Sequence, residues 1–254
     1  MSGTDAAAQK VRTGRIHLID SIRGFTIISM VLFHLCYDLR FINGVQLSFF
    51  RPPFMDVWRD SISWTFLFVA GLMYAQSHDN ARRGAKYLLV GLAVRIATTV
   101  ANVDVPVRFG IFFCMGACTL ACLLLDRCRL LPRSVPACLA LAGAFLLVLG
   151  VNSGYVSIGD WVVRLPGELY SWGGLTWLGF PSPTFESGDY YPLLPYLLMY
   201  LSGATLGRHL REKGGYPAWA YAQGPRWLEF LGRHTIAVYL LHQPINLLAL
   251  GDLL

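Results

Sequence analysis

Long apolar runs, separated by short polar and basic stretches, make up most of the chain. A helix needs about 20 mostly apolar residues to cross a lipid bilayer. Seven segments approach this requirement: 22–42, 60–78, 86–101, 107–125, 135–151, 192–208 and 232–251. The pattern therefore predicts an all-α polytopic transmembrane helical bundle of about seven spans, with six to eight as the range. We interpret residues 1–254 as a single transmembrane domain that begins with a polar cytoplasmic tail over residues 1–18.

The segment 152–191 interrupts this alternation of spans and short connections. It is rich in glycine, proline, tryptophan and tyrosine and shows no helical periodicity. Aromatic side chains of this kind suit the headgroup level of a membrane, and long connections are often functional. We therefore predict a long extracytoplasmic loop over 152–191.

The composition agrees with a membrane protein and excludes several other classes. Of the 254 residues 55% are hydrophobic and 14% are charged, whereas ordinary soluble domains carry about 25% charged residues. This excludes a disordered protein, an ordinary soluble enzyme and a nucleic-acid-binding arm, so we expect no nucleic-acid partner. The six cysteines show no C-x-x-C spacing, which argues against a disulfide framework and against a zinc site. We expect no bound metal.

The basic residues indicate how the chain is oriented in the membrane. The formal net charge is +6. With the N-terminus in the cytoplasm, 14 lysines and arginines fall on the inner side and five on the outer side, leaving Arg23 and Arg95 within predicted spans. Because cytoplasmic loops carry an excess of these residues, we predict a cytoplasmic N-terminus and an outer C-terminus.

A stripe of polar residues follows the first predicted span. Asp20, Arg23, His34 and Asp38 lie within about 60° of one another on a helix of 100° per residue. Asp20 and Arg23 are spaced for an ion pair, and His34 lies about 16 Å beyond Arg23 along the axis. An imidazole oriented by a carboxylate is suited to general-base catalysis, so we predict that His34 and Asp38 are catalytic. The alternative is structural: His34 bonds a neighbouring helix and Asp38 pairs with Arg40.

Three further positions are candidates for binding. Arg95 in the third predicted span either pairs with an acid or holds a cofactor phosphate. His242 and Gln243 precede Pro244 in the last span, which either lines a substrate cavity or marks a helix kink. Asp189 at the outer mouth of the sixth span either holds a cationic acceptor or caps the helix.

Small residues recur at helical spacing in two spans. Cys114, Cys118 and Cys122 share one face of the fourth span, and Gly203 and Gly207 share a face of the sixth. A soft-metal or redox role is conceivable for the thiols. Close helix packing explains both sets better.

Four stretches of sequence occur in the order found in a known family. They are RIHLIDSIRGFTIISMVLFHLCYDL, VRFGIFFCMGACTLA, SGDYYPLLPYLLMYLSGATLGR and LGRHTIAVYLLHQPI. Together they cover nearly the whole chain, and the first and third are fairly specific. On these motifs the sequence resembles the heparan-alpha-glucosaminide N-acetyltransferase catalytic-domain family, which includes many bacterial membrane proteins.

The resemblance implies a multi-pass enzyme of the bacterial cell membrane that takes acetyl groups from cytosolic acetyl-CoA. The acceptor it implies is the amine of a terminal glucosamine across the membrane. His34 matches an asparagine near the reaction centre of the animal lysosomal enzymes, whose catalytic histidine lies in the loop after the first span. The present sequence has no histidine between 35 and 59. It also has Phe113 where many bacterial members have histidine, and Tyr196 where the family usually has tryptophan.

These observations lead to one main hypothesis and two alternatives. The main one is an acetyl-CoA-dependent N-acetyltransferase in the lipid bilayer, acting on a small-molecule or glycan amine. In it, acetyl-CoA passes Arg23, the acceptor passes Asp189, and His34 accepts the amine proton, either for direct transfer or as an acetylated relay. The alternatives are a non-catalytic scaffold and a proton-coupled transporter that uses His34 and Asp38. The choice between monomer and homodimer stays open.

Overall fold

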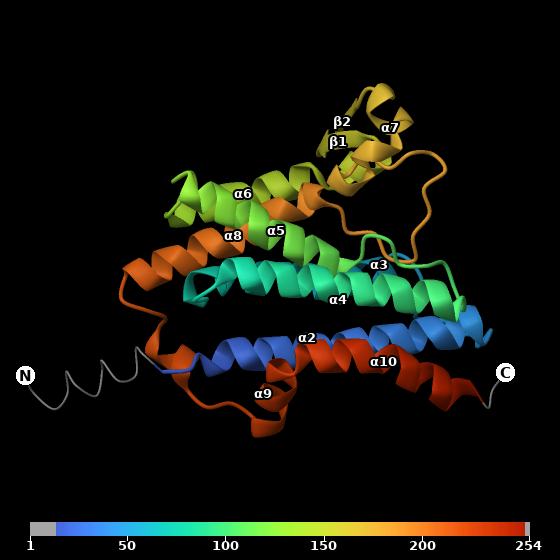
Figure 1. Cartoon of the computed structure of the whole chain (residues 1–254), viewed down its shortest axis with the longest axis horizontal. Coiled ribbons are helices and arrows are strands. Elements are labelled where there is room, and N and C mark those ends of the chain that lie inside the picture. The colour runs from blue at the N-terminus through green and yellow to red at the C-terminus, as the bar shows by residue number, and fades with distance from the viewer. Residues whose placement is uncertain (1–13, 252–254) are drawn as a thin grey trace, which may run out of the picture. The chain divides into compact units, whose positions relative to one another are not determined.

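The computed structural model describes residues 14–251. Most of the predicted cytoplasmic tail, with Lys10 and Arg12, lies outside this range. The structure is mostly helical (Figure 1). Its longer helices are α2 (His17–Tyr37), α3 (Phe54–Leu72), α4 (Asn80–Ala101), α5 (Ile111–Arg127), α6 (Val135–Leu147), α8 (Leu193–Glu212), α9 (Arg226–Arg233) and α10 (Thr235–Leu250).

Each of the seven predicted spans overlaps one of these helices, with ends that differ by up to six residues. Within the described residues, three helical segments are long and apolar enough to cross a membrane: His17–Ile42, Asn80–Ala101 and Val135–Ser153. Thr235–Leu250 is apolar but shorter. The largest shift concerns the second span, predicted over 60–78, because helix α3 begins six residues earlier and ends at Leu72.

The prediction of an entirely helical fold is wrong in one segment. The long connection contains an antiparallel hairpin of β1 (Tyr155–Ile158) and β2 (Trp161–Arg164). It also contains the short helix α7 (Glu168–Ser171) and a 3₁₀ turn, η4 (Gly173–Leu178). The hairpin turn consists of two residues, and the first of these, Gly159, has a φ of +57°, a value that suits glycine because it has no Cβ. The predicted loop is therefore a folded region.

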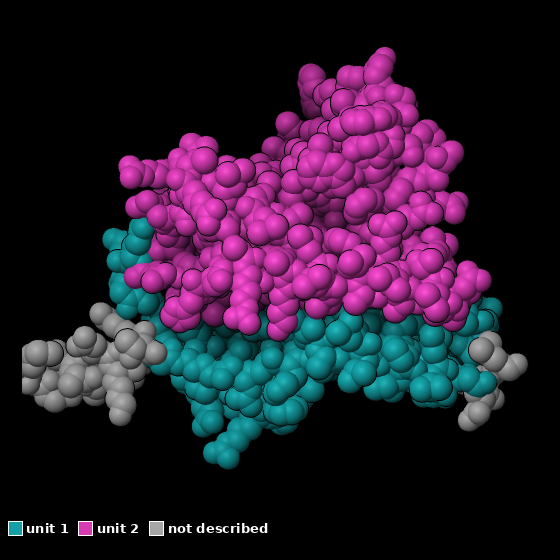
Figure 2. All heavy atoms as spheres, in the orientation of Figure 1, with its two compact units in different colours: residues 1–66, 212–254 teal, residues 67–211 magenta. Residues whose placement is uncertain are grey.

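The chain divides into two compact units, which are coloured separately in Figure 2. The first consists of Met1–Phe66 and Glu212–Leu254, and the second of Leu67–Arg211. The first unit thus combines segments that are far apart in the sequence.

In the first unit, α2 packs against α9 and α10. The contact with α9 depends on two glycines, because a Cβ added at Gly24 would lie 2.0 Å from the Leu228 carbonyl oxygen, and one at Gly232 would lie 1.8 Å from that of Asp20. Only hydrogen side chains allow the two backbones to come so close. Toward the other end of α2, Met30 and Phe33 belong to a buried apolar cluster.

In the second unit, α4 packs against α5, and glycines again permit the contact. A Cβ at Gly91 would lie 2.9 Å from the Phe113 backbone nitrogen. A Cβ at Gly203 or at Gly207 would lie 2.1 Å from a backbone carbonyl oxygen of α3. The close-packing interpretation of Gly203 and Gly207 is therefore confirmed. Cys114, Cys118 and Cys122 are buried free thiols.

Candidate functional site

Two histidines from opposite ends of the sequence meet where α2 lies beside α10 (Figure 1). The ring centroids of His34 and His242 are 4.9 Å apart, with an interplanar angle of 53°. His34 also contacts Phe33 edge to face at 5.8 Å. Among the described residues, the structure gives the His34 side chain no hydrogen-bond partner. Its ring nitrogens are therefore not engaged by any other described side chain or by the described backbone.

Asp38 lies one turn beyond His34 and is 1% exposed. Both of its carboxylate oxygens accept from Nε2 of Gln243, at 2.9 and 3.1 Å. Arg40, the partner in the structural alternative, donates to the carbonyl oxygens of Leu47 and Phe50. Asp38 also begins a π-helical turn, η1 (Asp38–Ile42), and such turns occur frequently at functional sites. The carboxylate therefore connects α2 to α10.

The hydrogen bonding of His242 determines which of its ring nitrogens carries the proton. Its Nδ1 lies 2.5 Å from the carbonyl oxygen of Tyr239, and a carbonyl only accepts, so Nδ1–H donates. In the neutral ring, Nε2 then carries a lone pair. That Nε2 atom is buried and has no partner among the described residues. Such a nitrogen can accept a proton or a hydrogen bond from a bound amine.

Two amide atoms on α10 are in the same situation. Gln243 Oε1 and Asn246 Nδ2 are buried without a partner in the described part of the chain. Because a buried polar atom without a partner is costly, these atoms indicate a position for a polar ligand. We call His34, Asp38, His242, Gln243 and Asn246 the buried polar cluster.

The buried polar cluster brings together two pairs of residues that the sequence had singled out separately, His34 with Asp38 and His242 with Gln243. Asn246 was missed, although it lies four residues after His242 and therefore on the same helix face. Phe33 of the buried apolar cluster contacts the His34 ring, and polar groups in apolar surroundings act on one another more strongly than in water. The arrangement offers imidazole bases, a carboxylate and amides to orient a substrate.

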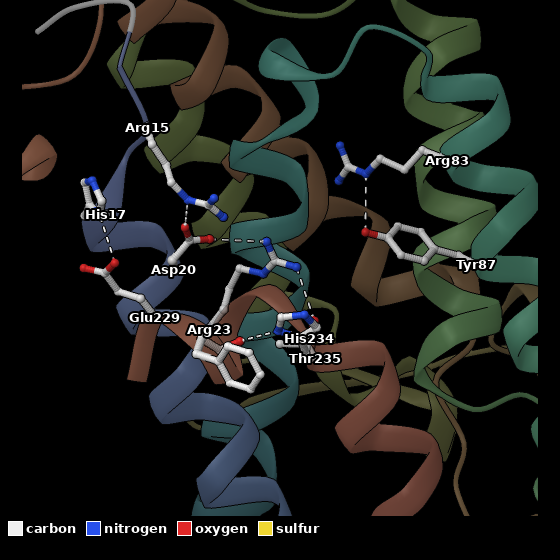
Figure 3. A network of polar contacts seen from close by, with 10 residues as sticks. Arg15, His17, Asp20, Arg23, Arg83, Tyr87, Glu229, His234 and Thr235 are labelled. Carbon is white, nitrogen blue, oxygen red and sulfur yellow. Dashed lines mark hydrogen bonds and ion pairs between the residues drawn. The ribbon is translucent and has the colours of Figure 1, made fainter. Parts of the chain in front are cut away.

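A second group of polar contacts lies at the other end of α2 (Figure 3). Asp20 forms ion pairs with Arg15 and, at 3.9 Å, with Arg23, which confirms the pairing predicted from their spacing. Arg23 also donates to the Thr235 hydroxyl at 3.2 Å. The guanidinium that was predicted to bind the cofactor is thus positioned by both α2 and α10.

Beside this group, α9 supplies a buried acid. Glu229, 2% exposed, lies with Oε2 2.8 Å from Nδ1 of His17, and its Oε1 accepts from the Gly224 backbone at 2.7 Å. The hydrogen bond from His17 lowers the pKa of Glu229 below its ordinary value. A cavity of about 400 Å³ adjoins His17 and is also lined by Arg15 and Tyr221.

We expect the Glu229 contact to make stability depend on pH. A carboxyl whose pKa is lowered by folding stabilises the native state above its ordinary pKa of 4.5, and this stabilisation is lost as the pH falls through the lowered value. The Tm of wild type should therefore exceed that of Glu229→Gln above about pH 5, and the gap should narrow on further acidification. Thermal unfolding in neutral detergent measures this gap, with the exposed Glu186→Gln as control. A gap that is constant down to about pH 3 would contradict the assignment.

Two predicted binding residues belong to the second unit. The Asp189 carboxylate lies near the start of α5, with Oδ2 3.5 Å from where a Cβ on Gly110 would stand. Arg95 lies on α4, two turns before its end, and lines a cavity with Arg108. Phe113, where many family members have histidine, packs on Gly91. Substrate binding by Asp189 and cofactor binding by Arg95 stay predictions.

Comparison with known proteins places the chain in a family. A family model described as the catalytic part of heparan-alpha-glucosaminide N-acetyltransferase matches residues 15–244. Comparisons with curated proteins and with solved structures give no match. The matched range includes four of the five residues of the buried polar cluster, all but Asn246, and suggests a membrane-bound N-acetyltransferase activity. The chain therefore belongs to the heparan-alpha-glucosaminide N-acetyltransferase catalytic-domain family.

Proposed function

We propose that the protein is a transmembrane N-acetyltransferase. It moves the acetyl group of cytosolic acetyl-CoA to an amine, on an amino sugar or a glycan, at the outer side of the cell membrane. Family membership supports the reaction class. The observation that carries the proposal is the pairing of His34 with His242, whose buried Nε2 has no partner within the described residues.

The chemistry requires a base at this position. An amine acceptor arrives protonated, and only its neutral form has the lone pair that attacks a thioester carbonyl. His34 is assigned the role of accepting that proton, because the structure gives its ring no competing hydrogen-bond partner among the described residues. The new C–N bond forms as the thioester C–S bond breaks, and the proton held by His34 passes to the departing CoA thiolate. His242 Nε2 and Gln243 Oε1 accept hydrogen bonds from the remaining N–H groups of the acceptor. Asp38 is a positioning residue that holds Gln243 against α2.

The donor end of the site is assigned to the cytoplasmic side. Acetyl-CoA supplies an activated acetyl thioester, and its nucleotide portion carries phosphates. The cavity next to His17 suits such a group, because it is lined by the guanidinium of Arg15 and the aromatic ring of Tyr221. Arg23 lies six residues, nearly two helical turns, beyond His17 along α2 and extends the positive charge toward the buried polar cluster. On this basis we propose, as the sequence predicted, that Arg23 binds acetyl-CoA.

Acetyl transfer in isolated membranes tests the proposal. Labelled acetyl-CoA is offered together with matched amine and hydroxyl acceptors, and we expect label on the amines only. Binding of acetyl-CoA without transfer to any acceptor would contradict the enzyme assignment. Absence of acetyl-CoA binding would favour the scaffold or the transporter, since neither has a reason to recognise the nucleotide. Proton uptake coupled to solute entry would identify the transporter.

The same assay distinguishes direct transfer from a relay through His34. Direct transfer requires donor and acceptor together, so double-reciprocal plots at several acceptor concentrations intersect. A relay acetylates a ring nitrogen of His34 first and gives parallel lines, as in ping-pong kinetics. We propose direct transfer, because the family members that carry asparagine at the position of His34 have no imidazole there to acetylate.

A further inference from the structure

The second unit contains a cavity that the proposed acetyl transfer does not use. It measures about 310 Å³ and lies between α4, the start of α5 and the folded connection around η4. Arg95 and Arg108 line it, together with the hydroxyl-bearing residues Thr176, Ser182 and Thr184. Its lining contains two positive charges, three hydroxyl groups and no carboxylate.

Neither arginine is neutralised within the described part of the chain. The structure gives the guanidinium groups of Arg95 and Arg108 no ion pair and no hydrogen bond to another described residue. Arg108 lies over the ring of Phe185, 6.0 Å from its centroid. Arg95 lies on a helix that is apolar enough to cross a membrane, where an arginine is expensive and usually has a partner. Two guanidinium groups lining one cavity without a counter-charge indicate an anionic ligand.

The backbone around the cavity is held in place before any ligand arrives. The hydroxyl of Thr98, one turn after Arg95, accepts from the Val107 backbone at 3.1 Å. The backbone N–H of Arg108 donates to the Ser187 hydroxyl at 2.9 Å. These two bonds connect α4, the α4–α5 connection and the segment before α8. Because the backbone is ordered in advance, ligand binding costs less conformational entropy.

We propose that this cavity is a binding site for a phosphate group. Guanidinium forks match the oxygen geometry of phosphate in a bidentate manner, and the neutral hydroxyl groups satisfy further oxygens without adding charge. In the predicted orientation the cavity lies at the outer side of the membrane. The phosphate then belongs either to the headgroup of an anionic lipid or to a soluble phosphate ester outside the cell.

The proposal gives Arg95 a different ligand from the one predicted from sequence. Arg95 lies near the outer end of α4 in the predicted orientation, whereas acetyl-CoA is drawn from the cytosol. The site therefore stands independently of the acetyl-transfer proposal. It holds for a catalytic and for a non-catalytic protein alike.

Binding to two probes of known chemistry tests the site and identifies the source. The chain is purified in maltoside, a detergent that contains no phosphate. It is titrated with glycerol 3-phosphate or with phosphatidylglycerol, and the shift in Tm is recorded. Diacylglycerol and glycerol are the matched probes without phosphate. The variants are Arg95→Gln, Arg108→Gln and Arg95→Lys, with Arg164→Gln as an exposed control in β2 that carries the same change of charge.

We expect one phosphate probe to raise the Tm of wild type and of Arg164→Gln. Arg95→Gln and Arg108→Gln should each weaken its binding by about tenfold or more. Arg95→Lys keeps the charge but loses the planar guanidinium fork, so its affinity should lie between those of wild type and Arg95→Gln. An intermediate affinity also shows that Arg95→Gln loses binding and not folding. A response to phosphatidylglycerol alone identifies a lipid headgroup, and a response to glycerol 3-phosphate identifies a soluble ester. No response to either probe, or equal binding by all variants, would overturn the proposal.

Discussion

Replacing His34 with alanine is expected to lower the rate of acetyl transfer by about 10²–10⁴, the usual contribution of general acid–base catalysis. The physical reason is that the variant lacks the imidazole of α2 that accepts the proton of the amine. Expression, Tm and acetyl-CoA binding should stay near wild-type values, because the nucleotide is assigned to the other end of α2. The measurement is the initial rate with labelled acetyl-CoA and the best amine acceptor.

The matched control for this variant is His78→Ala, which removes an exposed histidine of the second unit. It should transfer acetyl groups at the wild-type rate. His242→Ala removes the other imidazole of the pair. Because His242 Nε2 is assigned to hold the acceptor, this variant should raise the KM for the amine more than His34→Ala does. Normal turnover by His34→Ala would leave the histidine with a packing role only and would remove it from the reaction.

Replacing Gly232 with alanine is expected to have the largest effect on stability. The added Cβ would stand 1.8 Å from the Asp20 carbonyl oxygen and 2.9 Å from the Gly24 backbone nitrogen. Backbone atoms cannot rotate out of the way, so α9 has to separate from α2. Overpacking of this kind costs about 3 kcal/mol or more, which corresponds to a decrease in Tm of roughly 6–12 °C.

Thermal unfolding of the purified protein in detergent measures this effect. The control is Gly143→Ala in α6, where the added Cβ meets nothing within 4 Å. Alanine favours a helix over glycine by about 0.5–1 kcal/mol, so the control should be unchanged or slightly stabilised. Equal Tm values of Gly232→Ala and wild type would show that α2 and α9 do not make this close contact.

The sequence predicted the positions of the long helices because apolar periodicity is a local property of the chain. It also predicted the members of the candidate site on α2, since His34 and Asp38 are separated by one helical turn. His242 and Gln243 were recognised separately, as polar residues in an apolar run. That the four side chains meet depends on contact between α2 and α10, which no local pattern encodes.

The features that were missed have the same kind of explanation. Asn246 is an ordinary polar residue until its Nδ2 is known to be buried without a partner in the described structure. The tautomer of His242 follows from the hydrogen bond of its Nδ1 to the carbonyl oxygen of Tyr239, which no sequence pattern indicates. The hairpin did leave a signal, because two runs of β-favouring residues flank the dipeptide Gly159–Asp160, a turn of the kind that joins paired strands.

The first unit combines the two ends of the chain, and this has a consequence for biosynthesis. Gln243 follows Asp38 by 205 residues, which the ribosome adds in about 10–40 s at 5–20 residues per second. During that interval α2 is already made, while the amide that binds its carboxylate does not yet exist. The buried polar cluster is therefore completed last, when α10 reaches α2. An incomplete chain that lacks α10 holds only two of the five residues of the buried polar cluster, His34 and Asp38.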